Sequence, residues 1–312
     1  LYESQNYTAA RDALEKVIEI DPEFAGGYAN LGEVYLKLGE VSKAIAALSK
    51  AVELAPDLTQ VQLKLAFLSM LQNNPDRAES LLSEALKHST GDLSAKYMLA
   101  RIYQMKNNFQ KSEQIYKQLL EENSRSAQAY LALAGLLIRQ GKDDQAEHYL
   151  KTAIEKYPQS IKTIIALCGF YLHNQEFKKA EDLLHKAIHH NPDSSELHLL
   201  LGRLYAQANQ WDQSEDAFLQ AVQANPQNPK PYIESAHYYS ARNLNNKALA
   251  MYHKALEIQP QNAGIQLQIA KFHLNNQNFD KASEYIQKII SQQPNFIDAK
   301  ILQAQLLMAT NQ

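Results

Sequence analysis

The fold is decided by residues 25–58, AGGYANLGEVYLKLGEVSKAIAALSKAVELAPDL, because their pattern of small, aromatic and proline positions returns every 34 residues. The register continues without insertion through the full windows 25–58, 59–92, 93–126, 127–160, 161–194, 195–228, 229–262 and 263–296. Residues 1–24 and 297–312 match parts of the same window. A fixed period of this length indicates a solenoid. We expect one continuous array over residues 1–312, and a longer parent protein because the register starts and stops inside a window.

A first helix is predicted in every window from its fourth, seventh, eighth and eleventh places, whose spacing matches the 3.6-residue period. In residues 25–58 these places hold Tyr28, Leu31, Gly32 and Tyr35. The eighth place is Gly, Ala or Cys in every full window. A side chain this small lets the next helix approach closely.

Each first helix is expected to end at a residue suited to a left-handed cap. The expected caps are Gly39, Asn73, Asn107, Gly141, Asn174, Asn209, Asn243 and Asn276. A second helix follows, with its own apolar stripe of Ala44, Leu48 and Ala51 in the first full window and a proline after it in most windows. At the front, residues 1–3 are expected to end one first helix, and residues 8–20 to form its partner.

These residues resemble the tetratricopeptide repeat family, whose pattern of aromatic, Leu, Gly or Ala, Tyr, and then Ala, aromatic, Ala and Pro they match along essentially the whole sequence. The match is weakest in residues 59–92, with Gln62 and Ser69 at aromatic places, and in residues 93–126, with Lys96 at one. The resemblance implies an all-α fold, an α-solenoid in which antiparallel helix pairs form a right-handed superhelix. First helices would line a concave groove.

Global composition excludes few functions. The net charge of −3 offers no general reason to bind nucleic acid or an anionic membrane, so neither partner is expected. No stretch approaches the roughly 20 apolar residues of a membrane helix. A single cysteine excludes an internal disulfide and fits either the cytoplasm or the periplasm, so the compartment stays open.

The sequence predicts no enzyme, because the glycine-rich phosphate loops, GxSxG and HExxH are all absent. We assign no catalytic residue, no cofactor and no metal. His185 and His189, one turn after Glu181, have the spacing of a metal chelate, but a solvated helix face carries the same residues and is the preferred interpretation. Cys168, at a small eighth place, is interpreted as a packed thiol.

Aromatic residues that open the second helices are expected to be core residues: Phe109, Phe177, Trp211 and Phe279.

The groove is expected at the second, fifth, ninth, twelfth and thirteenth places, which lie opposite the packed stripe. Together they hold seven basic residues, three acidic ones and two histidines. The ninth place also holds two consecutive glycines, Gly135 and Gly169, which indicate either a hollow for a ligand or close helix packing. The candidate partner-binding residues are Tyr97, Arg101, Gly135, Arg139, Ile165, Gly169, His173, Leu199, Arg203, Ile233, His237 and Lys271.

The predicted function is a non-catalytic scaffold that binds an extended acidic protein segment, or another anionic chain, along residues 97–241. Solvated charge without a specific ligand is the alternative for the basic residues. Two other functions stay open. The chain could be the regulatory or substrate-recruiting arm of an enzyme or of a bacterial export or exopolysaccharide assembly, or it could self-assemble through its repeat ends.

Overall fold

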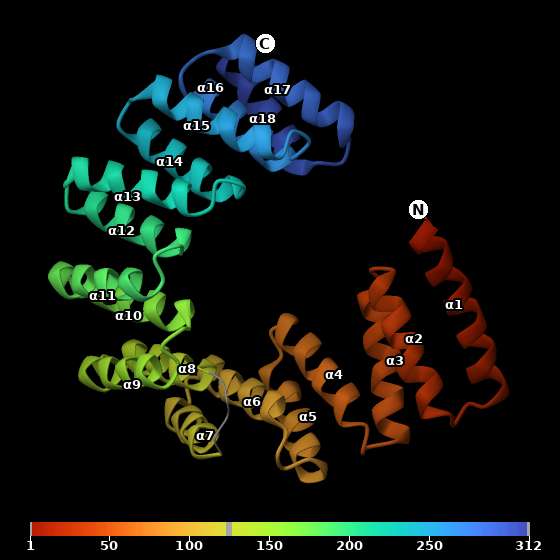
Figure 1. The fold of residues 1–312 in the computed structure, drawn as a ribbon. Helices are drawn as coiled ribbons and strands as arrows, with labels where there is room; N and C mark the ends of the chain where they lie inside the picture. The colour runs from red at the N-terminus through yellow and green to blue at the C-terminus, as the bar shows by residue number, and fades with distance from the viewer. Residues whose placement is uncertain (1, 123–126, 311–312) are drawn as a thin grey trace. The chain divides into compact units, whose positions relative to one another are not determined.

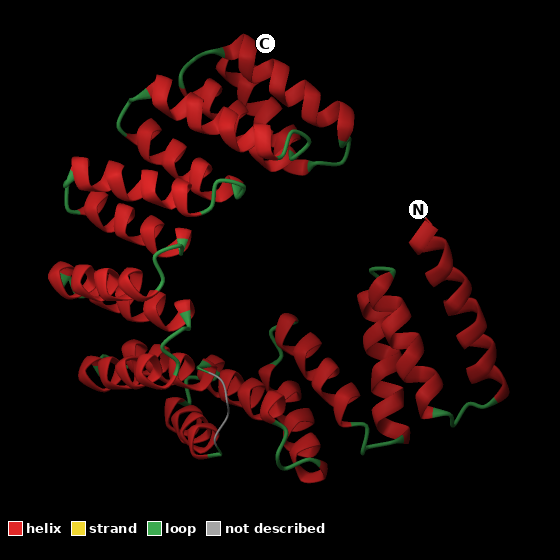
Figure 2. Ribbon diagram, viewed as in Figure 1, coloured by secondary structure: helices red, strands yellow, loops and turns green. Residues whose placement is uncertain are grey.

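The computed structural model describes residues 2–122 and 127–310, which form eighteen helices and no strand, joined by short loops (Figure 2). The chain divides into two compact units, Leu1–Thr163 and Ile164–Gln312. The prediction of one unbroken array across both units stays a prediction. In the described residues no helix has the combination of length and apolar character that crossing a membrane requires.

Unit 1 consists of antiparallel helix pairs (Figure 1). Its helices are α1 (Tyr2–Ile20), α2 (Ala25–Lys37), α3 (Val41–Leu54), α4 (Thr59–Leu71), α5 (Pro75–His88), α6 (Leu93–Met105), α7 (Phe109–Glu121), α8 (Gln128–Arg139) and α9 (Asp143–Lys156). The first helices α2, α4, α6 and α8 each pack against the second helix that follows and the one that precedes. The fold is therefore an all-α solenoid, as the sequence predicts.

Unit 2 repeats this arrangement (Figure 1). Helix α10 (Ile161–His173) begins just before the boundary, and the others are α11 (Phe177–His190), α12 (Ser195–Gln207), α13 (Trp211–Ala224), α14 (Pro229–Ala241), α15 (Asn245–Ile258), α16 (Ala263–Asn275), α17 (Phe279–Gln292) and α18 (Ile297–Ala309). Every first helix starts at the first residue of its window, except α8, which starts one residue later. The period therefore predicts helix starts closely.

The predicted stripes form the core. In the first full window Leu31, Ala44, Leu48 and Ala51 are all at most 3% exposed. The eighth-place residues of α2 to α16 are buried as well, which confirms that a small side chain there lies between packed helices.

The N-terminal expectation is wrong for residues 2–20, since α1 is one continuous helix rather than the end of one helix and the start of another. Neither Pro nor Gly occurs in residues 2–20, so the backbone has no strong breaker. Leu1 lies outside the described residues.

The caps recur at the fifteenth place of each full window. Residues with positive φ are Gly39, Asn73, Asn107, Gly141, Gln175, Asn209, Asn243 and Gln277. Six expected caps are confirmed, whereas Asn174 and Asn276 were wrong by one residue. Hydrogen bonds at the turn explain the shift: the Gln277 and Asn278 amides donate to the Leu274 and His273 carbonyls at 3.0 and 2.8 Å. The buried stripes on both sides hold this register, so it prevails over the residue type.

Replacing Gln277 with Gly is expected to raise the free energy of unfolding by about 0.5–1 kcal/mol. The left-handed conformation costs a residue with a Cβ atom roughly 1–2 kcal/mol, and the greater freedom of glycine in the unfolded chain offsets part of the gain. Chemical denaturation followed by circular dichroism measures the difference. The control is Asn243→Gly, with little change expected because Asn tolerates positive φ. A loss of stability in Gln277→Gly would contradict the prediction.

Polar residues at aromatic places keep hydrogen-bond partners. The Gln62 amide donates to the Pro56 carbonyl at 2.9 Å, and the Ser69 hydroxyl donates to the Leu65 carbonyl at 2.8 Å. Pairing of this kind lets buried polar groups be tolerated, although among the described residues the Gln62 Oε1 atom is buried without a partner. The weakest window of the sequence therefore still folds as a helix pair.

Tyrosines at the eleventh place connect neighbouring repeats. Tyr103 donates to Glu79 at 2.9 Å, Tyr205 to Glu181 at 2.9 Å and Tyr239 to Glu215 at 3.1 Å. Burial, with the hydrogen bond to Glu181, raises the pKa of Tyr205 to about 12. These phenols stay protonated as donors that connect first helices to the preceding second helices.

Candidate binding surface on the first helices

In each unit the ninth and thirteenth places of the first helices are exposed, and we call these residues the first-helix face of that unit. All ninth-place residues are exposed: Glu33, Phe67, Arg101, Gly135, Gly169, Arg203, His237, Lys271 and Gln305. So are all thirteenth-place residues: Lys37, Leu71, Met105, Arg139, His173, Gln207, Ala241, Asn275 and Ala309. The geometry follows from the helical period, because these places lie opposite the buried stripe.

The fifth place contributes much less to this surface. Leu199 is 3% exposed and belongs to the core around α13 to α15. Tyr97, Ile165 and Ile233 are half-buried. This apolar row therefore packs mainly between helices and leaves only partial surfaces for a ligand.

Charged side chains at the second and ninth places of the first helices are not equally available. Arg203 forms an ion pair of 2.7 Å with Glu234 of the next window, and the Lys230 ammonium lies 3.8 Å from a Glu196 oxygen. Within the described residues, Arg101 forms no ion pair. The basic excess counted from sequence is therefore partly neutralised in unit 2.

Partners at the sixth place were missed by the sequence analysis. Glu234 occupies the sixth place of the window after that of Arg203, and Lys64 stands in the same relation to Glu33. The sixth place was outside the five places assigned to the groove. The signal that could have revealed both pairs is opposite charge at the ninth place of one window and the sixth place of the next.

Other basic residues of the face differ in their surroundings. The Arg139 guanidinium lies over the Phe109 ring at 5.7 Å, and the His237 ring meets the Tyr252 ring at 5.9 Å. Lys271 is exposed and forms no ion pair among the described residues. A ligand would thus find Arg101 and Lys271 less engaged than Arg203.

Gly135 and Gly169 face open space. Apart from its chain neighbours and the nearby backbone of its own helix, a Cβ atom added to either one would meet no described atom within 4 Å. At Gly32, by contrast, an added Cβ would lie 2.6 Å from Leu48 Cγ. Helix packing therefore explains Gly32 but does not explain the two groove glycines.

Two residues outside the first-helix face, His185 and Cys168, were considered as a metal ligand and a nucleophile. His185 Nε2 lies 3.0 Å from the Tyr205 hydroxyl, and the described residues contain no cluster of three or more His, Cys, Asp or Glu placed to hold a metal ion. Cys168 is buried, and burial raises the pKa of its thiol to about 11. A thiol that stays protonated at neutral pH is a poor nucleophile.

The core assignment of Trp211 is wrong in part, because this side chain is 38% exposed. The Arg242 guanidinium covers one face of the indole at 4.7 Å, and the Tyr238 hydroxyl donates to the Trp211 carbonyl at 2.9 Å. A cation–π contact thus replaces burial at this position.

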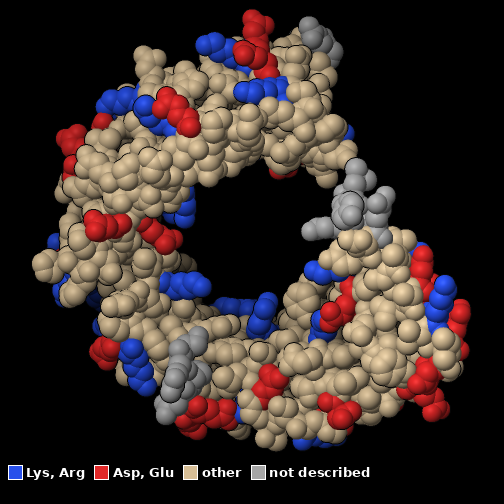
Figure 3. Space-filling model, turned by 45° about the vertical axis from the view of Figure 1, so that its right-hand side comes forward, with Lys and Arg blue, Asp and Glu red and all other residues tan. Residues whose placement is uncertain are grey.

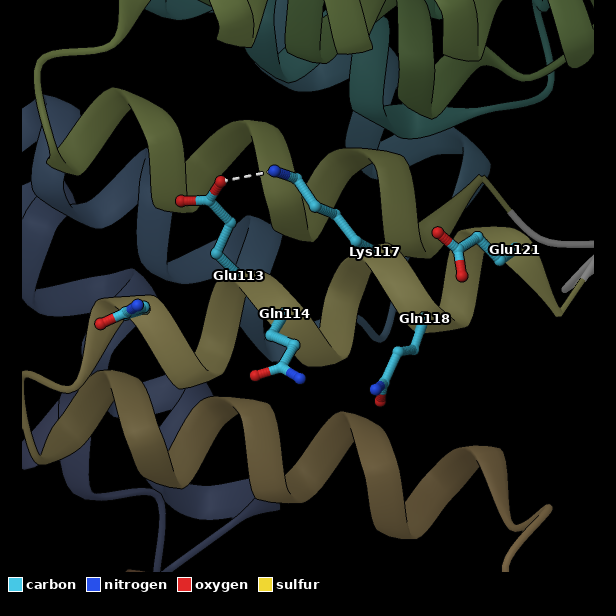
Figure 4. Close-up of a pocket in the computed structure, with 6 residues that line it drawn as sticks. Glu113, Gln114, Lys117, Gln118 and Glu121 are labelled. Atoms are coloured by element: carbon cyan, nitrogen blue, oxygen red, sulfur yellow. Dashed lines mark hydrogen bonds and ion pairs between the residues drawn. The ribbon is translucent and has the colours of Figure 1, made fainter.

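A shallow pocket lies along α7, and the sequence did not indicate it (Figure 4). It is lined by Gln110, Glu113, Gln114, Lys117, Gln118 and Glu121. Glu113 accepts a hydrogen bond of 2.7 Å from Lys117. The lining is polar and open to solvent, as expected for the outer side of a second helix.

Charge on the visible surface is mixed. Lys and Arg side chains are interspersed with Asp and Glu side chains, so no field of one sign covers this side (Figure 3).

The folded units define a class of protein, the helical-repeat solenoids with an exposed first-helix face. A family model described as Tetratricopeptide repeat matches residues 107–168, 171–233 and 241–306, together more than half of the chain. A second, described as Cytochrome c-type biogenesis protein H TPR domain, matches residues 2–129. The chain belongs to the tetratricopeptide repeat family and is a scaffold for protein interaction.

Solved structures of similar fold include yeast Tom70, with 18% identity, a TM-score of 0.48 and coverage of 98% of this chain and 78% of that one. The MamA protein has 24% identity, a TM-score of 0.47 and coverage of 52% and 88%. The human IFIT1 dimer with PPP-AAAA has 18% identity, a TM-score of 0.47 and coverage of 93% and 69%. No curated protein sequence matches the chain.

Proposed function

We propose that this scaffold holds an extended acidic protein segment against its first-helix face without catalysing a reaction itself. The supporting observation is that the ninth place is exposed on every first helix and carries Arg101 in unit 1 and Arg203 and Lys271 in unit 2. A guanidinium group can bind a carboxylate through two parallel hydrogen bonds. Arg101, which has no ion-pair partner among the described residues, is the principal anchor.

Preorganisation supports the mechanism. The first helices are held by largely buried stripes, so the exposed side chains project from backbone that is already ordered. A partner segment then loses its own conformational freedom on binding, while the scaffold loses little. The open space at Gly135, next along the ninth-place row after Arg101, would allow the segment's backbone to approach closely.

Charge reversal tests the proposal. We expect Arg101→Glu to weaken the binding of a fluorescein-labelled Glu-rich peptide at least tenfold, because a charge-assisted hydrogen bond contributes about 1.5–3 kcal/mol and tenfold corresponds to about 1.4 kcal/mol. A smaller loss is expected for Arg203→Glu, since Glu234 already occupies Arg203. Fluorescence anisotropy at two salt concentrations measures both effects.

The controls are Lys50→Glu on α3 and Lys288→Glu on α17, which make the same charge change on second helices, away from the first-helix face. They should leave the affinity nearly unchanged. The proposal fails if the native chain does not bind the acidic peptide, or if the Arg101→Glu and Arg203→Glu double variant binds it equally well.

A second candidate function is supported by the match of residues 2–129 to a cytochrome c-type biogenesis protein H TPR domain. That match lies within unit 1. In this case deletion of the gene should lower the amount of haem-containing c-type cytochrome, measured by haem staining. An unchanged amount would reject a role in cytochrome c biogenesis.

A further inference from the structure

An exposed apolar cluster lies on the first-helix face of unit 1. Phe67 is 50% exposed, Leu71 is 69% exposed and Met105 is 42% exposed. We call these three residues the apolar cluster. Phe67 occupies a ninth place, while Leu71 and Met105 occupy thirteenth places, and in other windows these two places carry charged or polar residues such as Arg203 and Arg139.

The cluster adjoins Arg101. Phe67 and Leu71 are one helical turn apart on α4, and Arg101 and Met105 are one turn apart on α6, so each pair lies on one helix face. Helices α4 and α6 contact each other directly. Corresponding places of consecutive windows therefore form a block of four side chains, three apolar and one cationic.

Contacts elsewhere support this register. In both units a ninth-place residue reaches the sixth place of the next window, as Glu33 does with Lys64 and Arg203 does with Glu234. The equivalent of Lys64 beside Phe67 is Met98, which is half-buried against the core of α4 to α6. The apolar surface thus continues from Phe67 onto α6.

The fold does not require these apolar residues. In unit 2 the same places on α12, α14 and α16 carry Arg203, Gln207, His237, Ala241, Lys271 and Asn275, none of which is a large apolar residue. An exposed group of large apolar side chains is unfavourable in water and commonly marks an interaction surface. Its occurrence beside an arginine without an ion pair among the described residues indicates a ligand with two kinds of side chain.

We propose that the apolar cluster binds a large apolar side chain of the partner segment while Arg101 binds a neighbouring carboxylate of the same segment. This inference rests on the proposed function and specifies its partner as an acidic peptide with an apolar residue. Helices in contact lie roughly 8–10 Å apart, and an extended chain advances about 3.3 Å per residue. The apolar and acidic residues should therefore stand two to three residues apart.

Two labelled peptides test the inference on the full chain. Both are Glu-rich, and they differ only at one position two residues before a Glu, which is Leu in one peptide and Ser in the other. We expect the Leu peptide to bind the native chain about tenfold more tightly. In the Phe67→Ser and Leu71→Ser double variant the two peptides should bind equally, with the affinity of the Ser peptide unchanged.

Ile20→Ser is the matched control, because it removes an apolar side chain that is 84% exposed at the end of α1. It should keep the preference for Leu. Circular dichroism and thermal melting confirm that each variant is folded.

The outcomes separate the two ideas. Equal binding of both peptides to the native chain, lost in Arg101→Glu, would overturn the apolar subsite and leave the proposed function standing. Failure of both peptides to bind would overturn both. Concentration-dependent association of the native chain, absent from the double variant in sedimentation, would assign the cluster to a second copy and overturn the peptide subsite.

Discussion

Gly32→Ala is expected to lower the free energy of unfolding by about 2 kcal/mol, because it overpacks the core. The added methyl group would lie 2.6 Å from Leu48 Cγ and 3.3 Å from the Ala44 carbonyl oxygen. Leu48 is fully buried, so neither it nor the Ala44 backbone can move freely. Overpacking typically lowers the free energy of unfolding by about 1–3 kcal/mol. The higher helix propensity of alanine raises it by at most about 1 kcal/mol.

Leu48→Ala is the second single variant of a double-mutant cycle with Gly32→Ala. Alone it should cost about 2–5 kcal/mol, because it leaves a cavity in the core. Combined with Gly32→Ala it should cost clearly less than the sum of the two changes, because the new methyl group occupies part of the cavity. Urea denaturation measures the coupling, and strict additivity would show that the two residues do not compete for space.

The matched control is Gly135→Ala, the same substitution in a first helix at a position where no other helix lies within 4 Å of the added methyl group. It should raise the free energy of unfolding by about 1 kcal/mol. Equal effects of Gly32→Ala and Gly135→Ala would contradict the assignment of one glycine to packing and the other to an open surface.

The second large effect concerns His273, which is 3% exposed at the eleventh place of α16. Burial, with the nearby Lys281 and His253, lowers the pKa of His273 below its ordinary value of 6.5, and only Glu284 opposes this. The unfolded state therefore takes up a proton at a higher pH than the folded state does. The contribution of neutral His273 to the free energy of unfolding is therefore present above about pH 6.5 and decreases as the pH falls below that value.

His273→Phe should remove this acid sensitivity. As the pH falls from about 7.5 to about 5, the native chain is expected to lose more stability than the variant, because its unfolded state binds a proton at His273 more readily than its folded state does. Thermal melting across this range measures the difference. His237→Gln, at an exposed position of α14, should behave like the native chain, and identical pH profiles for native and His273→Phe would refute the prediction.

Helix boundaries and core residues could be predicted because they depend on local periodicity. The windows starting at Thr59, Leu93 and Ser195 coincide with the starts of α4, α6 and α12. The burial of Leu48 follows from the same stripe. Repeats contact mainly their neighbours, so a sequence pattern spanning about two windows contains most of the information that determines the helix boundaries and the core.

For the candidate binding surface, the sequence predicted only which positions of the 34-residue window are exposed. The ninth place is exposed as expected, because a helix must present some face to solvent. The surroundings of each side chain were not predicted, since they depend on the neighbouring repeat and the ninth place was not compared with the sixth place of the next window. Arg203 has Glu234 beside it, whereas Arg101 has the apolar cluster.

The sequence by itself determined the repeat, the helix pairs and the family, because a 34-residue period with small eighth places is compatible with few packings. Tertiary structure alone decided three features. Caps fall on Gln175 and Gln277 because the buried stripes hold the register of the turn. The space at Gly135 is open, whereas the space at Gly32 is filled by Leu48. Among the described residues Arg203 has an ion-pair partner while Arg101 has none, because these contacts join different helices and are not fixed by the periodicity within one helix.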